Sequence, residues 1–237
     1  MLNRWITFLL VAFLFVPFTG FAAFENGQIW NSVSNKSDLN SGLSRAFSAD
    51  DVALRQLLNS APKEHTGQSI EINLPMPNGQ LARFEIFESS IMEAELAAKF
   101  PELKTYKVYG IDDLSASGRV DISPAGFRGM LQTSTGRVFI DPVAGLYRSK
   151  ARQGNDFDGK FQCNAHRISP TAFSPDLIQN SDKARIAGSI KVYRMAMSAT
   201  QEYVNAVGGT RASALAEFNT TINRVNQIYE RDLGIRL

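Results

Sequence analysis

The stretch IEINLPMPNGQLARFEI, residues 70–86, shows most directly how this chain folds. Apolar and polar residues alternate over 70–74 and again over 84–86, on either side of the turn-forming sequence PMPNG at 75–79. Such alternation places one face of a strand in a core, and a turn between two runs makes them neighbours. We therefore predict an antiparallel β-hairpin.

Further β-prone runs follow this hairpin, at residues 106–109, 119–122, 127–132, 138–140 and 146–148. Turns rich in Gly, Pro, Ser and Asp separate them, and a spacing of about 8 to 12 residues per strand is typical of a sandwich or a curved antiparallel sheet. A short helix at 94–100, with Ser89 or Ser90 as its N-cap, interrupts the series. Residues 68–150 are thus predicted as one β-rich unit.

The segments around this unit differ in character. Residues 23–67 are polar and predict a weakly ordered entry segment with one short helix at 51–58. Residues 151–187 are rich in Gly, Asn, Asp, Ser and Pro and predict a linker, longer than ordinary connections. Residues 188–237 predict a strand, a short helix that ends at Gly208-Gly209, and a long helix. The fold class is therefore α+β, with a β-rich antiparallel unit, a linker and a β-α-α segment.

The long helix is expected to run from Thr210, its N-cap, to Asp232, with Gly234 as its C-cap. Its apolar residues recur at steps of 3 and 4, which places them on one face: Leu215, Phe218, Ile222, Val225 and Tyr229. We expect this face to be buried. Left in water, such a stripe is a docking or aggregation liability and predicts a mobile or self-associating C-terminal segment.

The N-terminus predicts export. Arg4 precedes an uncharged run over residues 5–16, whose length fits a signal-peptide core of roughly 7 to 15 residues and falls short of a bilayer span. Cleavage after Ala22 would leave 237 − 22 = 215 residues. An uncleaved anchor is the alternative, but it would need Pro17 and Gly20 inside the bilayer. We expect a secreted or periplasmic protein without a stable membrane anchor.

Charge argues against nucleic acid as a partner. Removing the leader removes one of the 25 basic residues, so 24 basic residues face 23 acidic ones, and the balance is 24 − 23 = +1. Both signs are scattered along the chain, whereas a binder of phosphate backbones needs a basic stripe.

No complete catalytic set is found in the sequence. The only histidines, His65 and His166, lie outside any H-E-x-x-H pattern, and the chain has no Gly-x-Ser-x-Gly elbow or phosphate-binding loop. Cys163 is the only cysteine, so an internal disulfide is excluded. It can be buried, form an intermolecular disulfide or ligate a metal. With His166 it forms a C-x-x-H pair, but a closed zinc site needs a second pair.

Two parts of the chain resemble one enzyme family. The sequences VYRMAMSATQEY at 192–203, GGT at 208–210 and TTINRVNQIYERDLGIRL at 220–237 resemble the start of the catalytic domain of bacterial reprolysin-like zinc metallopeptidases. The pro-region of the same secreted enzymes is similar to several upstream motifs, namely LPMPNG at 74–79, IMEAELAAKFP at 91–101, GIDD at 110–113, SPAGF at 123–127 and IDP at 140–142.

The resemblance implies a zincin-like α/β domain that hydrolyses peptide bonds of proteins or peptides with a zinc-activated water and a glutamate general base. The family's H-E-x-x-H-x-x-G-x-x-H helix lies downstream of the matched part and is not among these 237 residues. No catalytic or cofactor-binding residue can therefore be assigned, and this chain is expected to be a truncated precursor, inactive alone and without bound zinc. An exported stand-alone binding or inhibitory module, built on the pro-region, is the alternative.

Cys163 gains one more interpretation from this resemblance. A thiolate in the linker between the pro-region and the catalytic domain is a good zinc ligand and would displace the attacking water. We therefore consider Cys163 a metal ligand that would keep the full-length precursor latent.

Overall fold

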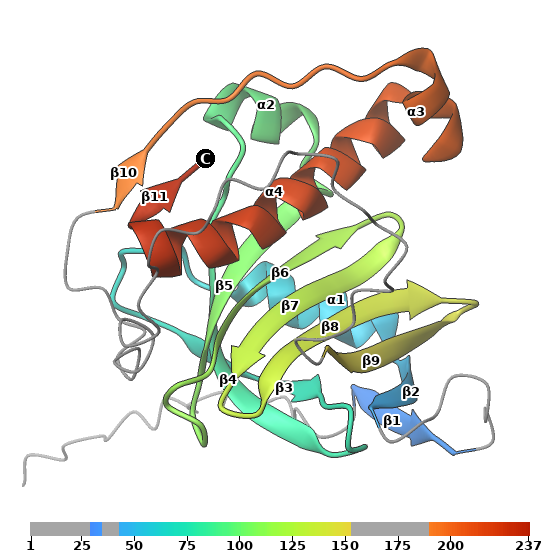
Figure 1. Cartoon of the computed structure of the whole chain (residues 1–237), viewed down its shortest axis with the longest axis vertical. Helices are drawn as coiled ribbons and strands as arrows, with labels where there is room; N and C mark the ends of the chain where they lie inside the picture. The colour runs from blue at the N-terminus through green and yellow to red at the C-terminus, as the bar shows by residue number, and fades with distance from the viewer. Residues whose placement is uncertain (1–28, 35–42, 153–189) are drawn as a thin grey trace, which may run out of the picture.

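The computed structural model describes residues 29–34, 43–152 and 190–237 (Figure 1). Within these residues, nine antiparallel strands form one curled sheet in the order β1-β2-β9-β8-β7-β6-β5-β4-β3. The strands are β1 (Trp30–Val33), β2 (Ser44–Ala49), β3 (Ile70–Pro75), β4 (Leu81–Glu88), β5 (Lys104–Gly110), β6 (Ser117–Ser123), β7 (Gly126–Thr133), β8 (Gly136–Val143) and β9 (Leu146–Arg152). The predicted α+β class is confirmed.

The predicted hairpin is confirmed as β3 and β4. Ile70 pairs with Ile86 and Ile72 with Phe84, so the apolar residues of both strands share the face that is buried. The later β-prone runs form β5 to β9, each paired with the next along the chain. Of the two architectures that the spacing favoured, the curved antiparallel sheet is the one observed.

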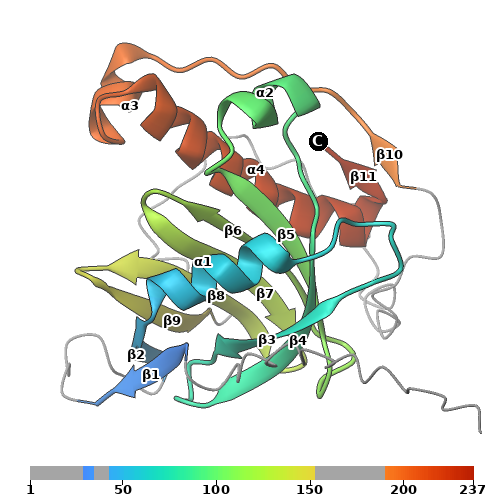
Figure 2. The same ribbon diagram turned by 180° about the vertical axis from the view of Figure 1, so that it is seen from behind.

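Helix α1 (Asp51–Ser60) covers the inner face of this sheet (Figure 2). Asp50 is its N-cap and accepts hydrogen bonds from the backbone N–H groups of Val52 and Ala53, each at 3.0 Å. Leu54 and Leu58 are fully buried against the sheet. Capping and burial of one apolar face explain why this short segment is helical.

The predicted weak order of residues 23–67 is wrong for the part that the structure describes. Strands β1 and β2 and helix α1 all lie in it, and Trp30, Phe47 and Leu54 belong to the hydrophobic core. The segment is polar on average, but most of its large apolar residues, among them Ile29, Trp30, Phe47, Leu54 and Leu58, are buried. Burial of such side chains, and not average polarity, decides whether a segment is ordered.

Close packing between β6 and β7 leads to a first testable prediction. A Cβ at Gly118 would lie 2.8 Å from the carbonyl oxygen of Met130, which is fixed in the backbone of β7. We expect Gly118→Ala to lower the free energy of unfolding by about 1–3 kcal/mol in urea denaturation. Gly129→Ala is the control, because its Cβ would first meet a movable methyl of Val120 at 3.2 Å. Equal losses in both variants would contradict the explanation.

The C-terminal part contains β10 (Lys191–Val192), α3 (Gln201–Ala206), α4 (Arg211–Leu233) and β11 (Ile235–Arg236). Both predicted helices are confirmed, and α4 begins after Thr210 and ends at Gly234, whose φ of 65° is the left-handed conformation of a C-cap. The predicted strand over 189–197 forms only over β10, which pairs in parallel with β11. The strand is this short because its pairing partner, β11, has only two residues.

Helices α1 and α4 lie on opposite faces of the sheet (Figures 1 and 2). Helix α4 crosses the outer face over β6 and β7. Among the described residues, no helix is both long enough and apolar enough to span a bilayer.

Helix α2 (Ala94–Lys99) begins after Glu93, which makes no side-chain capping bond. The prediction that Ser89 or Ser90 caps this helix is therefore wrong. Ser89 lies at the end of β4 and takes part in the contacts described next.

Candidate functional site: a polar interface between the sheet and α4

The face of α4 that packs on the sheet is polar. Its buried residues are Ala214, Ala216, Asn219, Thr220, Asn223, Asn226, Gln227 and Glu230. The expectation that the apolar stripe would be the buried face is wrong: Tyr229 is 38% exposed, and Phe218 stacks on Tyr203 of α3 at 5.4 Å between ring centroids. The reason lies in the sheet, because its outer face under α4 carries polar side chains such as Ser117, Arg119 and Asp121.

Strand alternation places these side chains outside. Val120 and Ile122 of β6 point into the core, so Arg119 and Asp121 point to the opposite face, towards α4. Asn223 of α4 donates from Nδ2 to the carbonyl oxygen of Val120 at 3.0 Å and so fixes the helix against the strand. Gln227 likewise donates to the Ser117 hydroxyl at 3.0 Å.

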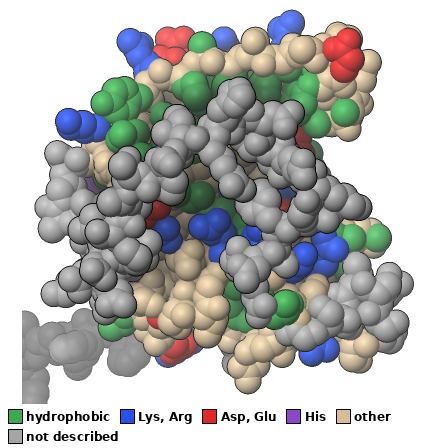
Figure 3. All heavy atoms as spheres, viewed as in Figure 1, with side chains coloured by type: hydrophobic (Ala, Val, Ile, Leu, Met, Phe, Trp, Pro, Cys, Tyr) green, Lys and Arg blue, Asp and Glu red, His purple; other side chains and the backbone are tan. Residues whose placement is uncertain are grey.

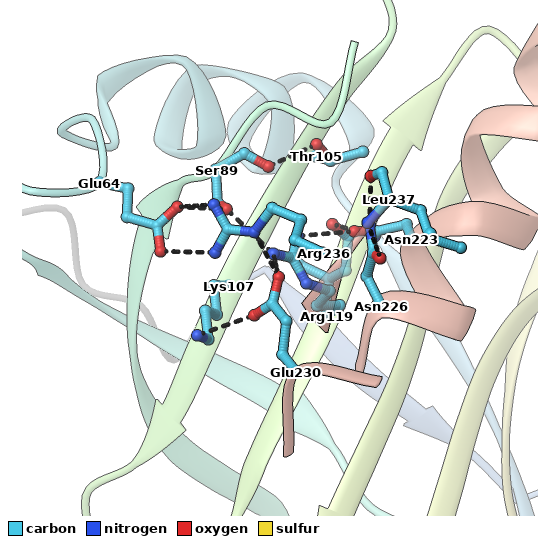
Figure 4. Close-up of polar contacts among 11 residues, drawn as sticks. Glu64, Ser89, Thr105, Lys107, Arg119, Asn223, Asn226, Glu230, Arg236 and Leu237 are labelled. Atoms are coloured by element: carbon cyan, nitrogen blue, oxygen red, sulfur yellow. Dashed lines mark hydrogen bonds and ion pairs between the residues drawn. The ribbon is translucent and has the colours of Figure 1, made fainter. Parts of the chain in front are cut away.

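Arg119 is the centre of one half of the interface (Figure 4). Its side chain is fully buried and forms an ion pair with Glu230 of α4. It also donates to Oδ1 of Asn223 at 3.1 Å and to the hydroxyl of Ser89 at 3.2 Å. A buried guanidinium is tolerated only with such partners, and here α4 supplies two of them and the residue after β4 supplies the third.

Arg236 of β11 extends this cluster to the segment before β3. Its two terminal nitrogens contact the two carboxylate oxygens of Glu64 at 2.7 and 2.9 Å, which is the bidentate geometry of a strong ion pair. Its Nε donates to Glu230 at 2.5 Å, and Lys107 of β5 lies 2.9 Å from the same carboxylate. Three cations thus surround two carboxylates, and Figure 4 shows them meeting between the sheet and the C-terminal segment.

Both carboxylates stay ionised in this cluster. Burial acts to raise the pKa of Glu64, but the hydrogen bonds from Arg236 and Ser89 outweigh burial and bring the pKa to about 2. Burial likewise acts to raise the pKa of Glu230, and the positive charge of Arg119 together with the Arg236 hydrogen bond outweighs it, so this pKa is lowered.

Asp121 is the centre of the other half. It is only 1% exposed and accepts hydrogen bonds from the Thr220 hydroxyl at 2.6 Å and from Nδ2 of Asn223 at 3.4 Å. Burial raises the pKa of Asp121 to about 6, although these bonds and the charge of Arg224 act to lower it. In contrast to Glu64 and Glu230, this carboxylate forms no direct ion pair with any residue that the structure describes.

Two ion pairs form the rim around Asp121. Arg128 of β7 lies 2.7 Å from Glu217, and Arg224 lies 2.5 Å from Asp141 of β8. Each joins one side chain of the sheet to one of α4. The interface is therefore electrostatically complementary from its centre to its edge.

Asn226 holds β11 in place. Its amide donates to the carbonyl oxygen of Leu237 at 3.0 Å and accepts from the Leu237 N–H at 2.8 Å. One side-chain amide thereby binds the strand as a neighbouring backbone would, and it positions Arg236 for its contact with Glu64.

The arrangement supports binding between the sheet and the C-terminal segment. Within the described ranges, no three His, Cys, Asp or Glu side chains are grouped so that they could hold a metal ion. His65 is exposed in a turn with a φ of 72°. Cys163 and His166 lie outside the described residues, so the role of Cys163 as a latency ligand stays a prediction, as does the leader at 1–22.

The interface residues were not singled out in the sequence. Glu64, Ser89, Arg119 and Asp121 are typical of solvated strand ends and faces. One available signal was the polar row on α4, where Thr220, Asn223, Gln227 and Glu230 recur at steps of 3, 4 and 3. Steps of 3 and 4 place these four residues on one face of the helix, just as the same steps place the apolar stripe on another face.

Residues 189–237 match the model of the reprolysin-like members of metallopeptidase family M12B. No curated protein and no solved structure matches the chain. The matched segment contains every side chain that α4 and β11 bring to the interface, whereas the sheet that receives them lies outside the match. The segment that is similar to this peptidase family therefore packs on a sheet that the match does not include.

Proposed function

We propose that this chain is the N-terminal part of the precursor of a secreted reprolysin-like zinc metallopeptidase, and that the sheet over 29–152 is its pro-region. The function of the sheet in this proposal is to hold the first long helix of the peptidase domain. The observation that carries the proposal is the docking of α4, which lies in the family match, through its polar face.

The two faces of α4 support the proposal that the sheet is a pro-region and that α4 belongs to the peptidase domain. The polar face is bound by the sheet, and side chains of this kind tolerate water once the sheet has left. The apolar face is only partly covered. Hydrophobic side chains also gather at the surface formed by β10, α3 and α4 (Figure 3), where Val192 is 69%, Tyr193 52% and Leu233 61% exposed. In a complete peptidase domain this surface would pack against the remaining structure.

In this proposal the sheet keeps α4 ordered before the rest of the peptidase domain has folded against the apolar face of the helix. The proposed pro-region therefore acts as a folding template, and its removal would follow folding. The proposed substrates are proteins or peptides, as expected for a peptidase family. No catalytic step is assigned to the described residues, because they do not offer the ligands that zinc requires.

The test uses the gene product with whatever sequence follows Leu237 in the same reading frame. We expect an H-E-x-x-H motif there, and hydrolysis of casein that a zinc chelator abolishes once the pro-region has been removed. A reading frame without this motif would contradict the proposal. It would favour a stand-alone exported binding or inhibitory module instead.

For the 237-residue chain itself we expect neither peptide hydrolysis nor stoichiometric zinc, because two histidines cannot supply the three imidazoles of the family's site. Elemental analysis after dialysis and a casein assay measure the two properties. One tightly held zinc per chain would contradict this prediction and would point to the Cys163 and His166 pair. Cys163→Ala would then be the variant that loses the metal.

A further inference from the structure

We propose that the outer face of β5, β6 and β7 is a reversible docking surface, which rebinds α4 and β11 after the chain between residues 152 and 190 has been cut, and that a proton on Asp121 strengthens this binding. The proposal deepens the proposed function, on which it rests for the roles of the two parts. Its physical argument needs only the interface.

The sheet has a hydrophobic core of its own. The buried hydrophobic cluster extends from Ile29 to Tyr147 and contains no residue of the described C-terminal segment 190–237. Separation of α4 from the sheet therefore exposes mainly polar side chains, besides Met130, Ala214 and Ala216, and opens no part of this cluster. Interfaces of this composition belong to parts that associate and separate as folded units.

The charged contacts between the sheet and the C-terminal segment are specific. Glu230 meets Arg119, Glu64 meets Arg236, Glu217 meets Arg128 and Asp141 meets Arg224, so each of these four carboxylates meets a guanidinium of the other part. A different helix on this surface would leave buried charges without partners. The surface is thus suited to one occupant, the polar face of α4 together with Arg236.

Asp121 lies among charged groups from four elements of the interface. The charged groups around it are Arg119 on its own strand, Arg128 on β7, Asp141 on β8, and Glu217 and Arg224 on α4. Of these, Arg128 and Arg224 lower its pKa, while each also forms its own pair with Glu217 or Asp141. Burial is the largest influence and raises the pKa of Asp121 to about 6, and Thr220 and Asn223 of α4 lie directly against this carboxylate.

The sign of the pH dependence follows from this shift. A carboxyl whose pKa is raised on docking contributes fully to binding below its ordinary value, 3.8, and this contribution is lost as the pH rises through about 6. Glu64 and Glu230 have lowered pKa values, so their contribution is lost only on acidification below their ordinary value of 4.5. Between pH 5 and 7.5, the change in affinity therefore reports on Asp121.

The experiment inserts a site for a specific protease between residues 153 and 189 of the full chain and cuts it after folding. Gel filtration shows whether the two pieces stay together, and dilution in an analytical ultracentrifuge gives their dissociation constant. We expect a reversible complex that is roughly tenfold tighter at pH 5 than at pH 7.5. Asp121→Asn keeps the size of the side chain and removes its proton equilibrium, so its two dissociation constants should agree within about twofold.

A second variant tests the same point from the helix and leaves the sheet unchanged. Thr220→Val removes the hydroxyl that donates to the Asp121 carboxylate. At pH 7.5 the Asp121 carboxylate is mostly ionised and would lack this hydrogen-bond donor. The variant should therefore weaken binding more at pH 7.5 than at pH 5. An equal loss at both pH values would contradict the role of the carboxylate.

Three results would overturn the proposal: pieces that do not reassociate after separation, a wild-type affinity that is the same at both pH values, and a pH dependence that persists in Asp121→Asn. These results leave the assignment to the peptidase family untouched, because that assignment is tested by the reading frame and the casein assay. Conversely, a reading frame without the zinc motif would contradict the proposed function, but it would not change the measured pH dependence of docking.

Discussion

Replacing Arg119 with methionine is expected to weaken the docking of α4 by about 3 kcal/mol. The guanidinium is fully buried and contacts Glu230, Asn223 and Ser89. Without it, Glu230 remains buried with only Lys107 and Arg236 as cations. Removal of one partner of a buried ion pair typically costs about 3–5 kcal/mol, and the two remaining cations keep the expected loss near the lower end.

Hydrogen exchange resolved by segment measures this effect, with urea denaturation for the whole chain. The amides of α4 should exchange faster in Arg119→Met, while those of the core strands keep their protection. Arg83→Met is the matched control on the same sheet, because Arg83 pairs with Asp112 in an exposed position and its removal should change nothing measurable. Similar changes in both variants would contradict a special role of the buried pair.

A double substitution separates the interaction from the penalty of an unpaired charge. Arg119→Met combined with Glu230→Met removes both charges, and apolar pairs of similar volume are often as stable as the ion pairs they replace. The double variant is therefore expected to be more stable than Arg119→Met alone. A loss equal to the sum of the two single losses would show that the two side chains do not interact.

Trp30→Ala is expected to lower the free energy of unfolding by about 3–5 kcal/mol. Trp30 is 3% exposed, and its ring packs edge-on against Phe127 at 5.7 Å and Tyr147 at 5.2 Å between centroids. The substitution removes one member of an aromatic cluster that joins β1 to β7 and β9. Urea denaturation followed by far-ultraviolet circular dichroism measures the loss.

Leu114→Ala is the control for this prediction, since Leu114 is large and apolar but 87% exposed. It should change the stability by no more than about 0.5 kcal/mol. If Trp30→Ala were as mild, the N-terminal strand would not belong to the cooperative core.

The strands from 70 to 148 could be predicted because each carries its own alternation of apolar and polar residues. Helix α4 could be bounded for a similar reason, since Thr210 and Gly234 mark its ends by local chemistry. These signals are contained within a few consecutive residues. Strand β1 was missed because its neighbours are polar and only Trp30, together with Ile29 just before it, reaches the core.

The interface could not be predicted because it depends on two segments far apart in the chain. Arg119 and Asp121 lie on the outer face of β6, which a free sheet would expose to water. Helix α4 carries an apolar and a polar face, and periodicity alone favours burial of the apolar one. The polar face of α4 is buried because the outer face of the sheet is polar. The sequence of α4 alone does not show which of its two faces meets the sheet.

The contact between Glu64 and Arg236 has an evolutionary consequence. The two residues are 172 positions apart, one in the segment before the hairpin and the other in β11. A mutation that removes one charge takes away the bidentate ion pair of the other until a compensating mutation arises at the second position. The two sites should therefore covary among descendants of this gene, and recombination within the intervening coding sequence should be tolerated only between parents that share the same pair.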